Sequence, residues 1–110
     1  MVQKAATALE ALGDANRRAI LESLRQGPRS VGEIARGLPI SRPAVSRHLR
    51  LLKEAGLVAD SPSGTQRHYR LEGAGIETVH AYLDGLWDEA LARFRLMAES
   101  TRPPKWRSWQ

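Results

Sequence analysis

Cationic and hydroxyl side chains recur at helical spacing between residues 42 and 53. At about 100° per residue, Ser46, Arg47 and Arg50 share one face, on which the first carboxylate is Glu54. Arginine can donate two parallel hydrogen bonds to guanine O6 and N7, and the DNA major groove is wide enough to admit a helix. From this segment alone, a solvated amphipathic helix is an equal alternative. The residues predicted to contact DNA here are Arg42, Pro43, Ser46, Arg47, Arg50 and Lys53.

The opposite face of the same segment is apolar. Val45, Leu49 and Leu52 fall on one narrow arc, which predicts burial. Ser41 is a favourable N-cap, and Gly56 is placed to end the helix. His48 lies beside the buried arc, so it either packs between helices or donates to a phosphate, and we favour the phosphate.

Three shorter helices are predicted before this one, over Lys4–Leu12, Ala15–Gln26 and Val31–Arg36. Asp14 is expected to cap the second, and Ser30 with Glu33 forms a capping box for the third. A tight turn over residues 37–40 then leads into the basic helix. A short helix, a turn and a longer basic helix form a helix-turn-helix arrangement.

The periodicity changes after Gly56. A strand is predicted over residues 57–60, turn residues over 61–65, and a return strand over Gln66–Leu71. A two-stranded hairpin after a basic helix is typical of a wing. Ser63, Thr65 and Arg67 lie at or near its tip, where small groups and a cation are expected to contact the DNA backbone or minor groove. An ordinary surface hairpin is the alternative, and His68 is expected at the surface.

The longest predicted helix runs from Gly73 to about Ser100. Its apolar stripe is wider than packing on one neighbour requires, which predicts a homodimer formed through this helix and the first. A monomer whose shorter helices cover the stripe is the alternative. The predicted interface residues are Ala8, Leu12, Val79, Leu83, Leu86, Trp87, Ala90 and Phe94.

Charge is unevenly distributed along the 110 residues, whose formal net charge is +5. Residues 41–70 hold six Lys/Arg and two Asp/Glu, whereas residues 71–100 hold two and six. A polyanion is therefore expected to contact the middle of the chain. We expect one domain over residues 1–100 and a flexible, basic, Trp-containing tail over 101–110. The absence of a signal peptide or an apolar run of membrane-spanning length predicts a cytoplasmic protein.

Four segments together resemble the ArsR/SmtB winged-helix repressors. They are residues 12–21, 30–35, 41–58 and 64–71, and the resemblance extends over residues 5 to about 98. It implies a mainly α fold with a small β-hairpin wing, dimerised through terminal helices, in a homodimeric repressor that binds near its own promoter. The family's base-contacting positions correspond to Arg42, Pro43, Ser46 and Arg47. Many members carry glutamine and serine at the first two, so the base preference should differ here.

Metal sensing is the alternative that the resemblance raises. The chain has no cysteine, and the last helix lacks the second histidine of the family's zinc-type sites. Glu77, His80 and Asp84 could contribute to a metal site across a dimer. We favour His80 as a packed interface histidine, and we expect no cofactor.

Sequence-specific binding of double-stranded DNA to a palindromic operator is the predicted function. A dimeric protein-interaction module without DNA binding is the runner-up, and the basic face of residues 42–53 argues against it. Since neither a phosphate-binding loop nor a nucleophile with a base is visible, we do not expect an enzyme. Any effector stays unidentified.

Overall fold

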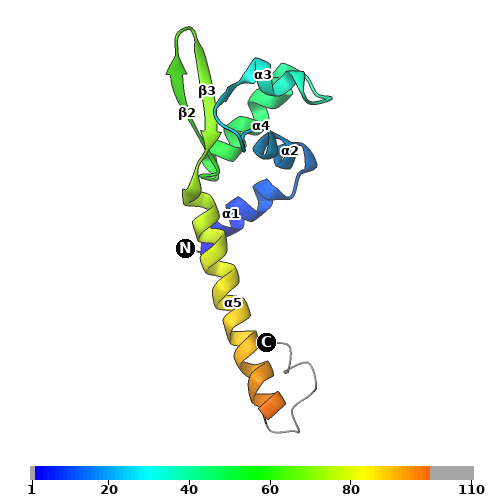
Figure 1. The fold of residues 1–110 in the computed structure, drawn as a ribbon, viewed down its shortest axis with the longest axis vertical. Coiled ribbons are helices and arrows are strands. Elements are labelled where there is room, and N and C mark those ends of the chain that lie inside the picture. The colour runs from blue at the N-terminus through cyan, green and yellow to red at the C-terminus, as the bar shows by residue number, and fades with distance from the viewer. Residues whose placement is uncertain (1, 100–110) are drawn as a thin grey trace. The chain divides into compact units, whose positions relative to one another are not determined.

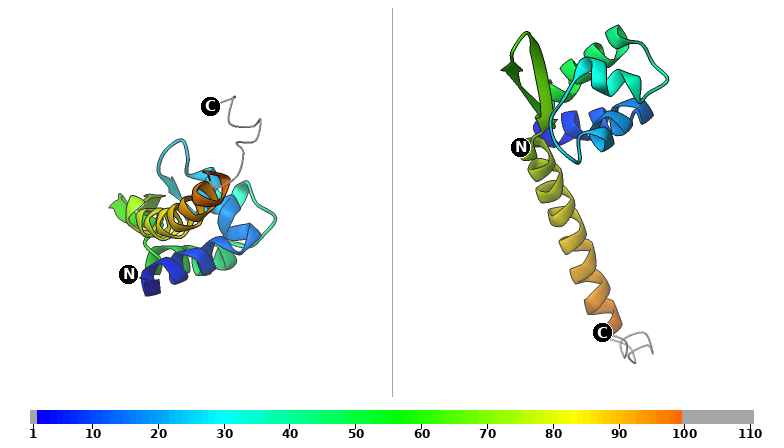
Figure 2. Two further views of the ribbon diagram at one scale, coloured as in Figure 1. Left: turned by 90° about the horizontal axis from the view of Figure 1, so that it is seen from below. Right: turned by 45° about the horizontal axis from the view of Figure 1, so that its top comes forward.

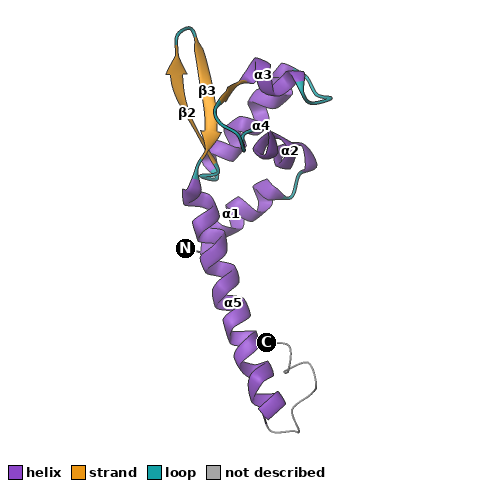
Figure 3. Cartoon of the chain, in the orientation of Figure 1, coloured by secondary structure: helices purple, strands orange, loops and turns teal. Residues whose placement is uncertain are grey.

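A computed structural model describes residues 2–99 of the chain. These residues contain five helices and a three-stranded sheet (Figures 1 and 3). The tail over residues 101–110, predicted to be flexible, lies outside the described residues. The elements in chain order are α1 (Val2–Leu12), α2 (Ala15–Ser23), β1 (Arg29–Ser30), α3 (Val31–Arg36), α4 (Arg42–Glu54), β2 (Val58–Ser63), β3 (Gln66–Leu71) and α5 (Gly73–Glu99).

Residues 2–80 form one compact unit around a small apolar core. Helices α1, α2 and α3 each contact α4, and Figures 1 and 2 show α2, α3 and α4 side by side. The basic helix predicted from the sequence, α4, is thus the central element of this unit, and we call it the recognition helix. The largest fully buried side chains are Ile20, Leu24, Ile34, Val45, Leu49, Leu52 and Val58.

Hydrogen bonds to side chains pair the free backbone N–H groups at the start of α2 and the free carbonyls at the end of α1. Asp14 caps α2 as predicted, because its carboxylate accepts from the backbone N–H groups of Asn16 and Arg17 at 2.8 and 3.1 Å. These bonds, the one from Arg17 first, lower the pKa of Asp14. Arg17 Nε and Arg18 Nη1 each donate, at 2.7 Å, to carbonyls of the last turn of α1. The end of α1 is therefore capped by side chains from α2.

Two details of these helices differ from the sequence prediction, in which the apolar positions of the first helix were Ala5, Ala8, Leu9 and Leu12. On α1 the inward face consists of Ala5, Ala8 and Ala11, while Leu9 remains 38% exposed. Three alanines allow close helix approach, which the larger leucine would prevent. Helix α2 ends at Ser23 rather than Gln26, with Leu24 as the C-cap residue.

The sheet has the order β1-β3-β2, and both pairings are antiparallel. The prediction of a two-stranded hairpin omitted β1, which pairs Arg29 with Tyr69 and Ser30 with His68. Strand β2 also extends through Pro62 to Ser63, where turn residues were predicted. Because β2 is an outer strand, the missing N–H of Pro62 removes no bond from the sheet's interior.

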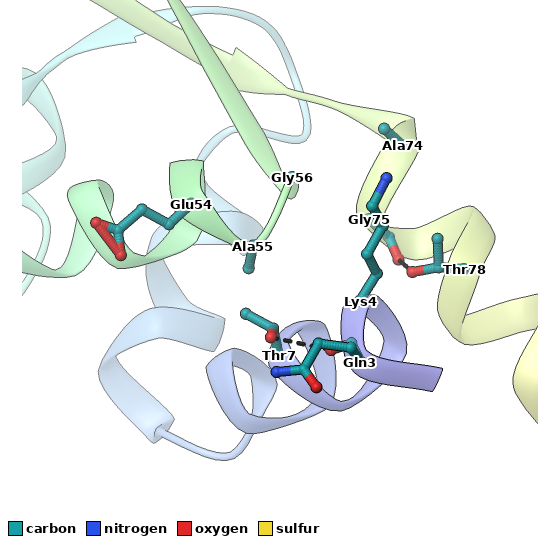
Figure 4. Close-up of a pocket in the computed structure, with 9 residues that line it drawn as sticks. All are labelled: Gln3, Lys4, Thr7, Glu54, Ala55, Gly56, Ala74, Gly75 and Thr78. Atoms are coloured by element: carbon teal, nitrogen blue, oxygen red, sulfur yellow. Dashed lines mark hydrogen bonds between the residues drawn. The ribbon is translucent and has the colours of Figure 1, made fainter. Parts of the chain in front are cut away.

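The start of α5 crosses the end of α4 at unusually short range (Figure 4). Gly75 N donates to Gly56 O at 2.8 Å, and Thr78 Oγ1 donates to Gly75 O at 2.7 Å. A Cβ on Gly75 would collide with the carbonyl oxygen of Ala55 and lie 2.9 Å from the carbonyl carbon of Gly56. Beside the crossing is a cavity of about 310 Å³, lined in part by Gln3, Lys4 and Thr7 of α1.

Gly75→Ala is therefore expected to lower the free energy of unfolding by about 1–3 kcal/mol, because the added methyl group meets backbone atoms that cannot rotate away. Gly85→Ala is the matched control in the same helix, since a Cβ there meets nothing within 4 Å. The control should gain about 0.5–1 kcal/mol from the better helix former. Urea unfolding of both variants at one protein concentration compares them, and equal stabilities would contradict the close crossing.

Residues 81–99 form the second compact unit, the remainder of α5. Its large apolar side chains are mostly exposed, with Leu86 at 52% and Trp87 at 59%. No helix within residues 2–99 combines the length and apolar character needed to cross a membrane.

Candidate nucleic-acid interface

Helix α4 presents the two faces that the sequence predicted. Val45, Leu49 and Leu52 are fully buried. Ser46, Arg47 and Arg50 are exposed, as are Arg42, Pro43 and Lys53. Ser41 Oγ accepts from Ala44 N at 3.3 Å, which fixes the first turn of the helix. The buried side chains therefore hold α4 against the core and leave its cationic face open.

Helix α3 is positioned by the capping box predicted at Ser30 and Glu33. Ser30 Oγ accepts from Glu33 N at 3.2 Å, and Ser30 N donates to Glu33 Oε1 at 2.9 Å. The bond from the Ser30 backbone is the main reason that the pKa of Glu33 is lowered. Helix α3 packs on α4, which completes the helix-turn-helix arrangement.

Arg42 turns back toward α3. The guanidinium lies beside Gly32, where an added Cβ would come within 2.5 Å of Arg42 Nη2 and displace this flexible side chain. Arg42 and Arg67 line one cavity of about 300 Å³ between α3, α4 and β3. One cation of α4 and one of the wing thus line the same surface hollow. Their positive charges favour the binding of an anion there.

The tip of the wing is exposed. Gly64 has a φ of 63° at the first of two loop positions, where a type II′ turn requires glycine. Ser63 and Thr65 flank it, and both are exposed as predicted. No large side chain covers the tip, so a sugar-phosphate backbone can approach it closely.

Asp60 connects the wing to the recognition helix. Its Oδ1 lies 2.9 Å from Lys53 Nζ, and its Oδ2 accepts from Arg67 Nε at 2.7 Å. The Asp60 side chain is only 8% exposed, whereas both cations are more than half exposed. Hydrogen bonds from Lys53 and then Arg67 lower the pKa of Asp60, so the carboxylate is ionised at neutral pH. Two cations predicted to contact DNA are already paired to one carboxylate.

His48 faces another helix rather than the cationic surface. Its Nδ1 lies 3.5 Å from Arg17 Nη1 of α2, and the residue is partly buried. The packing alternative therefore describes His48 better than the phosphate contact that we favoured. His68 is also partly buried, opposite Ser30 and Ser61 in the sheet, rather than a plain surface residue.

The residues predicted for a dimer interface divide into three groups by exposure. Ala8 has no exposed surface and Val79 is 4% exposed, so both belong to the protomer's own core, and their prediction as partner contacts is corrected. Leu12 and Leu83 are intermediate. The remaining four are exposed, and three of them are large apolar side chains: Leu86, Trp87 and Phe94, with the smaller Ala90.

Within residues 2–99 of one chain, no three His, Asp or Glu side chains lie close enough to hold a metal ion. His80, Glu77 and Asp84 are each exposed along α5. The metal-site alternative thus gains no support from a single protomer.

The chain is similar to known regulators over most of its length. Residues 14–60 match the family described as "Bacterial regulatory protein, arsR family". The chain is 50% identical over 93 residues to the HTH-type transcriptional regulator Rv2034 of Mycobacterium tuberculosis, covering 84% of this chain and 87% of that protein. It is 39% identical over 62 residues to the transcriptional repressor SdpR of Bacillus subtilis, covering 56% and 69%.

Solved structures resemble its fold. An ArsR-like transcriptional regulator from Rhodococcus sp. RHA1 superimposes with a TM-score of 0.75 at 33% identity, covering 91% of this chain and 94% of that one. The homodimeric winged helix-turn-helix DNA-binding domain Mb0332 of Mycobacterium bovis gives 0.65 at 32% identity, covering 84% and 85%. The expected winged helix-turn-helix fold is thereby confirmed.

Proposed function

Because this chain belongs to the arsR family of bacterial regulatory proteins, we propose that it is a homodimeric repressor that binds a palindromic operator near its own promoter. It acts in the cytoplasm, by binding double-stranded DNA rather than by catalysing a reaction. No cofactor enters this proposal.

The observation that carries the proposal is the two-faced helix α4. Val45, Leu49 and Leu52 fix it to the core, and the exposed face carries Ser46, Arg47 and Arg50. A positioned helix with several cations and a hydroxyl can enter a major groove and contact both base edges and phosphates. The exposed wing tip at Ser63–Thr65 adds a second contact to the backbone.

Dimer formation through α5 is supported by its exposed apolar side chains, since soluble monomers rarely expose such patches. The relative Mb0332 is described as homodimeric. A two-fold axis would place two α4 helices about 34 Å apart, one turn of DNA, and would require a palindromic site.

Genome-wide selection of fragments bound by the purified protein tests the proposal. Parallel selections with zinc, with nickel and with a chelator test metal response at the same time. We expect a palindrome with half-sites one helical turn apart, including a site at the protein's own promoter. Enrichment of no sequence above background would contradict specific binding.

Arg47→Ala and Arg42→Ala are each expected to reduce the free energy of DNA binding by about 1–3 kcal/mol for the base pair that the arginine contacts. Specificity at that base pair should be relaxed. Binding to operators substituted at single positions measures the loss. Arg93→Ala, which removes one cation from α5, is the control for net charge. A variant that weakens binding equally to every sequence would make that arginine a phosphate contact instead.

A further inference from the structure

Asp60 is an unexpected residue in a surface that must attract a polyanion. It lies between two cations that the proposed function uses, and its carboxylate oxygens are each occupied by one of them. The rest of the basic segment, residues 41–70, contains one other carboxylate, Glu54. A phosphate approaching Lys53 or Arg67 must therefore compete with Asp60.

The ion pairs also have a mechanical consequence. Lys53 belongs to the last turn of α4, Asp60 to β2, and Arg67 to β3. In the register of the hairpin, Asp60 is opposite Tyr69 and Arg67 is opposite Pro62, so the Asp60–Arg67 pair runs diagonally across the two strands. A nearly buried carboxylate thus joins the recognition helix to both strands of the wing.

We propose that Asp60 is a positioning residue that sets the specificity of DNA binding: it holds the wing in register with α4 and withholds Lys53 and Arg67 from indiscriminate contact with phosphates. This inference rests on the proposed function. Only a duplex that fits α4 and the wing together gains full binding energy, whereas random DNA gains little from cations that are already paired. Asp60 therefore lowers overall affinity and raises discrimination.

Asp60→Asn tests the inference, because asparagine keeps the shape of the side chain and removes its charge. Each released cation that contacts a phosphate should steepen the slope of log K against log [salt] by about 0.9. We expect the slope on random duplex to steepen by about 1–2 for each protomer in contact with the DNA, and the affinity for random duplex to rise at least about tenfold at 100 mM salt. The ratio of operator to random affinity should fall.

Asp88→Asn is the matched control, since it makes the same change in net charge on an exposed part of α5. It should leave the slope and the ratio unchanged. Asp60→Glu retains the charge and should restore the wild-type slope, which a purely structural role of the side chain would not require. Equal slopes for wild type and Asp60→Asn, with both folded, would overturn the inference.

A second comparison does not depend on the folding of Asp60→Asn. Lys53→Gln removes a paired cation, whereas Arg50→Gln removes one for which the described residues show no ion pair. Lys53→Gln should therefore flatten the slope of log K against log [salt] less than Arg50→Gln does. Equal flattening by the two variants would count against the proposed role of Asp60 in withholding Lys53 from phosphates. If the wild-type protein prefers no operator over random DNA, the proposed function fails together with the inference. If it prefers an operator, but Lys53→Gln and Arg50→Gln flatten the salt slope equally, only the inference fails.

Discussion

Leu86→Glu is expected to convert the dimer to monomers and to abolish measurable binding to a palindromic operator. Leu86 is 52% exposed, in line along α5 with Leu83, Ala90 and Phe94. A glutamate there would place a charge in the apolar contact on both sides of the two-fold axis, where desolvation of an unpaired carboxylate is costly. Sedimentation measures the mass, and binding to full and half operators measures the functional loss.

Leu96→Glu is the matched control for this substitution. Leu96 is 68% exposed on the same helix, but it lies about 130° from the centre of the stripe at 100° per residue. The Leu96→Glu substitution should therefore leave the dimer intact. A Leu86→Glu protein that stays dimeric would exclude the proposed interface, and a Leu96→Glu protein that dissociates would move the interface to the other face of α5.

Operator binding is expected to weaken by roughly 10³–10⁵ between 50 and 200 mM salt, if a dimer contacts about 6–10 phosphates. The exposed cations of two α4 helices and two wings would release that many counterions. Titrations at several salt concentrations give the slope directly. A flat response would mean that the cationic face of α4 is not the binding surface.

The recognition helix was predictable from the sequence because both of its signals are local. Ser41 as N-cap and the spacing of Val45, Leu49 and Leu52 depend on neighbours within a few turns. The same holds for α3 and β3, whose observed bounds are the predicted ones. These elements hold most of the residues that the proposed function uses.

The sheet was only partly predictable because its pairing is not local. Arg29–Ser30 has no strand pattern of its own and becomes β1 only because Tyr69 and His68 lie beside it. Pro62 and its serine neighbours were interpreted as a turn, since turn chemistry and an outer strand both tolerate proline. Because β2 is an outer strand in the order β1-β3-β2, Pro62 belongs to a strand and not to the turn.

The periodicity of the sequence does not show which side chains from different elements contact one another. The helical wheel places Lys53 on the outward margin of α4, but it does not reveal that Asp60 approaches from another element. It places His48 beside the buried arc without identifying Arg17 as its neighbour. Two residues predicted as partner contacts, Ala8 and Val79, are small or medium apolar side chains that the protomer's core uses first.

The outer strands of the sheet also bear on solubility. Exposed edges can template the addition of further strands, which leads to aggregation. Here β1 pairs over two residues only, and β2 carries Pro62 among small polar side chains. Neither edge offers a continuous row of free backbone donors and acceptors, so protein molecules crowded on neighbouring operators have no ready route to polymerise through their wings.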